Sequence, residues 1–166
     1  MENQQITDAL QAQFGADAVY GVTESHGILQ FTTGVDNIVP MLHFLYAHPE
    51  FKFQFLTDLA GIHFPDAKGQ ELGVIYHVHS LENNVRLMIK AYAPIEAPHF
   101  PTITGLYAAA NWMEREAFDF YGILFDGHPN LTRILNMDEM DYHPMRKEYP
   151  LEDATRHDKI DELFGR

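Results

Sequence analysis

The sequence contains no cysteine among its 166 residues. This absence excludes disulfide bonds and iron–sulfur clusters held by thiolates of this chain alone. No apolar run is long enough to cross a bilayer, so no segment is predicted to insert directly into a membrane. Residues 1–51 carry no lysine or arginine, and the formal net charge is −13. So acidic a chain is not expected to bind nucleic acid, which needs lysine and arginine to neutralise phosphates.

Sequence motifs of common active sites are also missing. There is no HExxH, no Gly-x-Ser-x-Gly, no Gly-x-Gly-x-x-Gly and no glycine-rich phosphate loop. The ten histidines are scattered, and among them His77 and His79 point to one face of a predicted strand. Two histidines without an identifiable third ligand are a weak metal pattern. They leave one alternative function open, a free-standing metal-dependent enzyme that uses His77, His79 and a nearby carboxylate.

Helix and strand patterns follow one another along most of the chain, which is long enough to form one domain. Apolar residues recur at helical spacing in two early segments, residues 4–14 and 37–48. Strand patterns cover five further segments, residues 19–22, 27–33, 51–59, 71–81 and 84–93. In the third of these, Phe51, Phe53 and Phe55 alternate as they would on the buried side of a strand.

This order of elements predicts the fold class. Helices segregate from a run of adjacent strands, so the class is α+β, a mixed β-sheet covered by helices. Periodicity fades after about residue 136, and two prolines interrupt the remaining residues. We therefore predict an α+β domain over residues 1–135 and an extended C-terminal interaction tail over residues 136–166.

The most distinctive stretch of sequence predicts a helix that ends at Gly122. A hydroxyl from Thr102 or Thr104 can cap its first turn. Trp112 and Phe118 lie off the main apolar face, so hydrophobic surface appears on more than one side. A helix of this kind is normally covered on two sides, and in so short a chain another protein can supply the second layer.

Three consecutive charged residues, Glu114, Arg115 and Glu116, lie within this helix. About 200° separates Glu114 from Glu116 around the helix axis, so the two carboxylates cannot converge on one metal ion. Arg115 can pair with Asp119 one turn later. Two interpretations stay open: a solvated face with one ion pair, or charges that are desolvated against a partner.

The segment EREAFDFYGILFDGHPNLTRIL resembles the signature of the 30 kDa subunit of respiratory complex I. The matching positions are Glu114, Arg115, Glu116, Asp119, Phe120, Tyr121, a basic position close to His128 and Pro129, Arg133 and Leu135. Two further blocks, FQFLTDLAGIHFP (53–65) and HPMRKEYPL (143–151), are similar to the same family. His63 departs from it, since the family usually carries an acidic residue there. The resemblance covers most of residues 51–151.

The resemblance implies a structural and assembly subunit of a proton-translocating NADH:quinone oxidoreductase. That enzyme passes electrons from NADH through FMN and iron–sulfur clusters to quinone. Such a subunit has no catalytic, cofactor-binding or metal-binding residues of its own, and the FMN and clusters belong to partner subunits. It lies in the peripheral arm, on the cytoplasmic side of the cell inner membrane. Its implied neighbours are the quinone-site subunit and the terminal iron–sulfur subunit.

The resemblance and the charge pattern together predict residues at a subunit interface. The predicted interface residues are Trp112, Glu114, Arg115, Glu116, Asp119, His128, Pro129, Arg133, Arg146 and Lys147. The last two add positive charge to a chain that is otherwise acidic, and charge complementarity between partners favours specific association.

Overall fold

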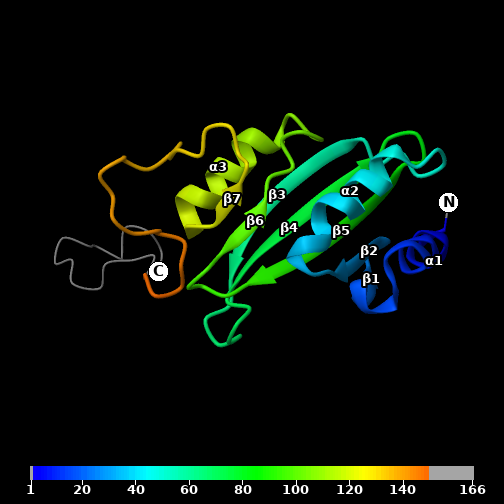
Figure 1. The fold of residues 1–166 in the computed structure, drawn as a ribbon, viewed down its shortest axis with the longest axis horizontal. Helices are drawn as coiled ribbons and strands as arrows, with labels where there is room; N and C mark the ends of the chain where they lie inside the picture. Colours follow the sequence, from blue (N-terminus) through cyan, green and yellow to red (C-terminus); the bar gives the residue numbers. More distant parts are fainter. Residues whose placement is uncertain (1, 150–166) are drawn as a thin grey trace, which may run out of the picture.

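A computed structural model describes residues 2–149 of this chain, which form three α-helices, two short 3-10 helices (Ala16–Ala18 and Val35–Asn37) and seven strands (Figure 1). The helices are α1 (Asn3–Phe14), α2 (Ile38–Ala47) and α3 (Ala110–Tyr121). The strands are β1 (Tyr20–Ser25), β2 (Ile28–Thr32), β3 (Phe55–His63), β4 (Leu72–Ser80), β5 (Val85–Ala93), β6 (His99–Pro101) and β7 (Leu124–Asp126). The predicted α+β class is confirmed.

The main sheet has five strands in the order β1-β2-β5-β4-β3. Strands β2 and β5 are parallel, and every other neighbouring pair is antiparallel, which makes the sheet mixed as predicted. Burial alternates along β4, where Val74, Tyr76 and Val78 are buried while His77 and His79 are half-buried. Side chains of a strand alternate between its two faces, so this period of two indicates that one face of β4 lies in the core.

Helices pack on the sheet through a single hydrophobic core. Met41, Leu42 and Leu45 of α2 have no exposed surface. In Figure 1, α2 crosses over the sheet, α3 lies at the β3 edge and α1 lies at the opposite end. The α3–β3 contact is close, because a Cβ at Gly61 would stand 2.5 Å from the ring of Tyr121. A glycine is therefore what lets α3 approach the edge strand.

The predicted strand at residues 51–59 is wrong in its position. Phe51 and Phe53 are buried but precede β3, and Phe55, its first residue, is 47% exposed. The chain turns at Lys52, which has a φ of 49°. This turn directs Phe51 back to α2, where its ring meets that of Phe44 edge-on at 6.3 Å. The alternating phenylalanines therefore mark a turn against a helix rather than one side of a strand.

The described part of the predicted tail, residues 136–149, contains no helix or strand, but it packs back on the domain. The Met145 amide donates to the carbonyl of Phe120 at 3.1 Å. The Lys147 amide donates to Nδ1 of His63 at 3.0 Å. These contacts hold the segment against the C-terminal end of α3 and the end of β3. The rest of the predicted tail, residues 150–166, lies outside the described residues.

Candidate subunit interface at helix α3

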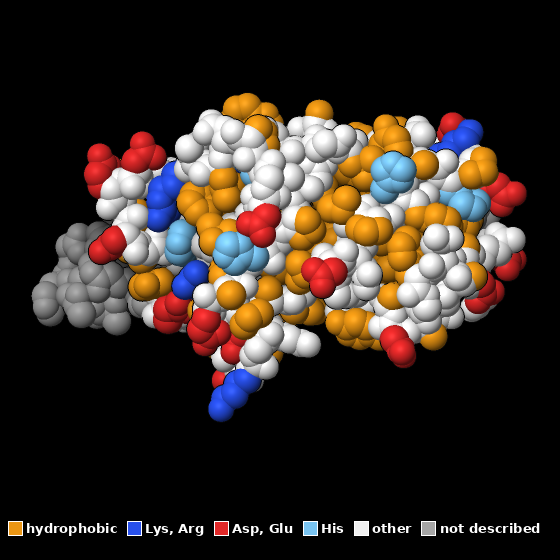
Figure 2. Space-filling view, in the orientation of Figure 1, with side chains coloured by type: hydrophobic (Ala, Val, Ile, Leu, Met, Phe, Trp, Pro, Cys, Tyr) orange, Lys and Arg blue, Asp and Glu red, His pale blue; other side chains and the backbone are white. Residues whose placement is uncertain are grey.

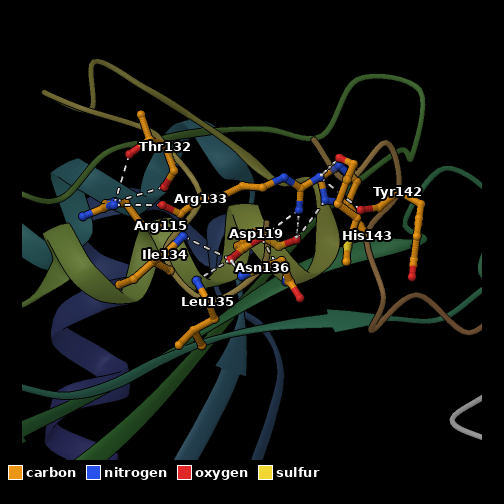
Figure 3. Close-up of polar contacts among 10 residues, drawn as sticks. Arg115, Asp119, Thr132, Arg133, Ile134, Leu135, Asn136, Tyr142 and His143 are labelled. Atoms are coloured by element: carbon orange, nitrogen blue, oxygen red, sulfur yellow. Dashed lines mark hydrogen bonds and ion pairs between the residues drawn. The ribbon is translucent and has the colours of Figure 1, made fainter. Parts of the chain in front are cut away.

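The carboxylate of Asp119 lies at the centre of a ring of hydrogen-bond donors (Figure 3). Its Oδ2 accepts from three consecutive backbone amides, those of Ile134, Leu135 and Asn136, at 3.1, 2.8 and 2.9 Å. Its Oδ1 accepts from Nδ2 of Asn136 at 3.0 Å and from Nη1 of Arg133 at 2.7 Å. Successive amides that converge on one anion form a nest. One helical side chain thus fixes the backbone of the following loop.

The electrostatics of Asp119 follow from this arrangement. Burial by itself favours the neutral acid, and the side chain has no exposed surface. The amides and the side chain of Asn136, with the amides of Leu135 and Ile134, outweigh that effect and hold the pKa of Asp119 well below its usual range. The group is therefore a permanent anion at physiological pH.

Two arginines complete the attachment of the loop. Arg133 donates to the backbone carbonyls of Asp119, Met140 and Tyr142 as well as to the Asp119 carboxylate. Arg115 donates through Nε and Nη2 to the carbonyl and hydroxyl of Thr132 and to the carbonyl of Arg133. A planar guanidinium with five donors is suited to bridging several carbonyls at once. We call residues 127–149, which these contacts hold on α3, the clamped segment.

Glu114 forms a second buried site on the opposite side of α3. Its carboxylate has no exposed surface and accepts from the Ile103 amide at 2.8 Å and the Thr102 hydroxyl at 2.6 Å. Burial raises the pKa of Glu114 to about 7, against the lowering effect of these two hydrogen bonds. Glu114 also contributes to raising the pKa of Tyr76, whose buried hydroxyl has no hydrogen-bond partner, although burial is the larger cause.

The enclosed ring of His128 lies beside this site, with Nε2 4.0 Å from Glu114. The amide of Asn130 donates to Nδ1 of His128, so the ring proton sits on Nε2 and is donated to the carbonyl of Asn111. Glu114 and His128 therefore fasten the segments before and after α3 to the helix.

The segment after Gly122 closes over the end of α3. The Nε of Arg146 donates to the Tyr121 carbonyl at 2.7 Å, and the ring of His143 packs edge-on to Phe118 at 6.1 Å. Gly122 has a φ of 74°, as predicted for the residue that ends the helix. A Cβ there would stand 2.6 Å from both Arg146 and His143. The second layer over α3 thus comes in part from this chain itself.

Large hydrophobic side chains remain exposed around the clamped segment. Trp112 of α3 is 60% exposed, although the guanidinium of Arg115 lies over its ring at 5.1 Å. The clamped segment adds further exposed hydrophobic residues, namely Leu135, Met137, Tyr142, Met145 and Tyr149. Grouped exposed apolar residues are characteristic of contact surfaces. This end of the molecule is the candidate interface.

The structure divides the predicted interface residues into two groups. Trp112, Glu116, Pro129 and Lys147 are exposed, and Arg115 and Arg146 are half-buried. Glu114 and Asp119 have no exposed surface, and the side chains of Arg133 and His128 are 11% and 0% exposed. These four shape the surface from within. That the exposed residues contact another subunit remains a prediction.

Three local expectations are wrong. Asp119 pairs with Arg133, not with Arg115. The Glu114 carboxylate is enclosed by this chain, so the charged triplet is not one solvated face. Thr102 and Thr104 do not cap α3, whose N-cap is Ala109 without a side-chain hydrogen bond. Thr102 instead binds the carboxylate of Glu114, because the chain between β6 and α3 folds alongside the helix.

Several important residues carried no recognisable signal in the sequence. Asn136 and Met137 lie where periodicity fades, and β6 and β7 are three residues each. Glu114 did carry one, since it follows Ala110 by four residues and precedes Ala117 by three. All three are buried, so the spacing alone places Glu114 on the core face.

His77 and His79 lie on one face of β4, as predicted. Within residues 2–149, no three His, Cys, Asp or Glu side chains are grouped closely enough to hold a metal ion. In the same residues, no helix is both long and apolar enough to span a membrane.

The family of the respiratory-chain NADH dehydrogenase 30 kDa subunit matches residues 31–155 of this sequence. The chain belongs to this family. One NADH-quinone oxidoreductase subunit of Rhizobium meliloti (strain 1021) is 42% identical over 144 residues, which cover 86% of this chain and 77% of the relative. The corresponding NADH-quinone oxidoreductase subunit of Mycobacteroides abscessus is 38% identical over 136 residues. That match covers 82% of this chain but 60% of the relative.

Solved structures show the same fold. A trypsin-resistant fragment of Nqo5 is 28% identical, with a TM-score of 0.64, and the match covers 79% of this chain and all of the fragment. A chain of the membrane-bound sulfane sulfur reductase, an archaeal respiratory membrane complex, has a TM-score of 0.74 at 22% identity. That second match covers 91% of this chain and 87% of the other, and it shows likeness of fold alone.

Proposed function

We propose that this chain is a structural and assembly subunit of a proton-translocating NADH:quinone oxidoreductase and has no active site of its own. In such an enzyme, electrons pass from NADH through FMN and iron–sulfur clusters to quinone. Under this proposal the FMN and the clusters reside in partner subunits, and this chain provides a contact surface for those subunits. Membership of the 30 kDa subunit family and the names of the curated relatives support the proposal.

The observation that carries it is the anion nest around Asp119. A buried carboxylate and two arginines immobilise a segment that has no helix or strand. Ordering such a segment costs conformational entropy. Here the hydrogen bonds of Asp119 and the two arginines offset that entropy loss within the chain, before any partner binds. The result is a rigid surface that exposes hydrophobic side chains, as expected of a preorganised contact surface rather than of a catalytic pocket.

The location follows from the same proposal. The chain would lie in the peripheral arm of the enzyme, against the quinone-site subunit and the terminal iron–sulfur subunit, on the cytoplasmic side of the inner membrane. The exposed Trp112 and the clamped segment are the surface that we assign to these neighbours.

A complementation experiment tests the proposal. Membranes from cells that lack this chain should have lost NADH-driven quinone reduction, and the wild-type chain should restore it. Arg133→Ala should restore little, because it frees the clamped segment, whereas Arg86→Ala on β5 should restore activity fully. The purified chain alone should neither oxidise NADH nor contain a flavin or a metal. Full quinone reduction without the chain would refute the proposal.

A further inference from the structure

Leu135 and Met137 are the most exposed large hydrophobic residues of the clamped segment. Their side chains are 65% and 69% exposed, on either side of Asn136. The backbone between them is fixed, because the amides of Leu135 and Asn136 and the side chain of Asn136 all donate to Asp119. Two flexible apolar side chains therefore project from an immobile base.

This arrangement differs from other exposed hydrophobic positions. Leu81 is also 65% exposed, but it is a single residue in the turn between β4 and β5. Isolated exposed leucines are common on protein surfaces. A pair on a preorganised backbone loses little further entropy on binding, which is the condition under which short anchors contribute strongly to affinity.

The exposed charged residues nearest to this pair in the sequence are acidic. Residues 134–145 include the exposed Asp138, Glu139 and Asp141 and no lysine or arginine. The arginines that border the segment direct their guanidinium groups inward, to Asp119 and to the carbonyl of Tyr121. Figure 2 shows several acidic side chains at this end of the molecule, with lysine or arginine side chains among them. A partner surface that meets these three exposed acidic residues favourably carries positive charge.

We propose that Leu135 and Met137 are paired anchors that enter an apolar pocket on another protein subunit, and that lysine and arginine line the rim of that pocket. This inference rests on the proposed function and specifies the chemistry of the partner. The acidic rim around the anchors repels nucleic acid and anionic lipid. It also disfavours a second copy of this chain, whose net charge is −13.

The first arm of the test removes the anchors. In cells that lack the chain, a tagged Leu135→Ala/Met137→Ala variant should co-purify with the other oxidoreductase subunits at least ten-fold less than wild type. Its melting temperature, measured on the isolated chain, should stay unchanged because both side chains are exposed. Leu81→Ala, at equal exposure, should co-purify like wild type.

The second arm tests the charge. Asp138→Lys/Glu139→Lys should reduce co-purification several-fold at low salt, whereas Asp8→Lys/Asp17→Lys, at two exposed sites at the α1 end of the molecule, should not. Wild-type chain that brings no other subunit with it refutes the proposed function. If the wild-type chain assembles and the anchor variant assembles as well as Leu81→Ala does, this inference is overturned while the proposed function stands. A wild-type homodimer that the anchor variant loses also overturns it, since the pocket would then belong to a second copy.

Discussion

Asp119 and Arg133 form a 2.7 Å ion pair across 14 residues of sequence, and the Asp119 side chain has no exposed surface. Burying a charge is costly unless every lone pair is satisfied. Here the carboxylate accepts five hydrogen bonds, three of them from successive backbone amides. The pair therefore determines the path of the loop, and through it the surface that the loop presents.

Asp119→Asn should release this loop. An amide cannot accept from all five donors, and its own NH₂ would face backbone N–H groups while Arg133 loses its anion. Breaking a buried pair in this way costs about 3–5 kcal/mol of the free energy of unfolding. Denaturant titration measures the total loss of unfolding free energy. Amide hydrogen exchange should accelerate most at Ile134, Leu135 and Asn136.

Asp126→Asn is the matched control, because Asp126 pairs with His99 at 2.9 Å while both side chains are more than half exposed. Its effect should stay below about 1 kcal/mol. The pKa of Asp119 is depressed, so its contribution exists above its usual value of 3.8 and is lost as the pH falls below it. The difference between wild type and Asp119→Asn should therefore shrink in acid. Equal stability of the two at pH 7 would show that the nest does not hold the loop.

Glu114→Gln should remove a pH dependence of stability. The folded-state pKa of Glu114 is raised to about 7 from 4.5, so the protonated form is favoured in the native state. Stability from this group is fully present below about 4.5 and is lost as the pH rises to about 7. A shift of this size corresponds to roughly 3–4 kcal/mol. Glutamine resembles the protonated acid, so the variant should be more stable than wild type at pH 8.

Unfolding free energies measured between pH 5 and pH 8 test this expectation. Glu116→Gln serves as the control, because Glu116 lies two residues along the same helix and is exposed. Its pH profile should run parallel to that of wild type. A Glu114→Gln profile that also runs parallel would mean that Glu114 is ionised throughout this range.

Gly61→Ala should disturb the packing of α3 on β3. A Cβ at this position would stand 2.5 Å from Cδ2 of Tyr121, so the ring or the strand must shift. Overpacking of this kind costs about 1–3 kcal/mol. Gly105→Ala is the control, because a Cβ there would meet nothing within 4 Å. In thermal melts, Gly61→Ala should have a lower melting temperature than Gly105→Ala. Equal melting temperatures would indicate that the Tyr121 ring moves aside without loss of stability.

Much of the fold could be predicted from the sequence because regular elements leave periodic patterns. The alternation along β4 and β5 predicted both strands to within a residue or two, and Gly122 marked the end of α3. Phe51 and Phe53 were misleading, since a turn at Lys52 gives two buried aromatic residues the spacing of a strand. Periodicity cannot distinguish these cases when the segment is short.

The nest at Asp119 could not be predicted, for a different physical reason. Its donors are backbone amides, which every non-proline residue possesses, so no residue pattern identifies Ile134 or Leu135 as its partners. The charged helix residues could be recognised as important. Their partners could not, because Arg115 was equally able to pair with Asp119 in sequence and in fact binds Thr132.

Two truncations test whether residues 140–149 belong to the folded domain. The sequence predicts a separable tail after residue 135, whereas the structure gives Arg133 two acceptors at the carbonyls of Met140 and Tyr142. Deleting residues 140–166 also removes the hydrogen bond between Arg146 and the Tyr121 carbonyl. The hydrogen bonds from the Met145 amide to the Phe120 carbonyl and from the Lys147 amide to His63 are lost as well. At about 0.5–1.5 kcal/mol for each of these five hydrogen bonds, the loss should total roughly 3–7 kcal/mol.

Deleting residues 150–166 alone leaves every one of these contacts in place, so this shorter deletion is the control. Urea titrations should give the longer truncation a lower midpoint than the shorter one. If the Δ140–166 chain proves as stable as the Δ150–166 chain, residues 140–149 are a separable tail after all. If it is less stable, the closing of α3 by His143 and Arg146 is part of folding, and a partner meets a surface that already exists.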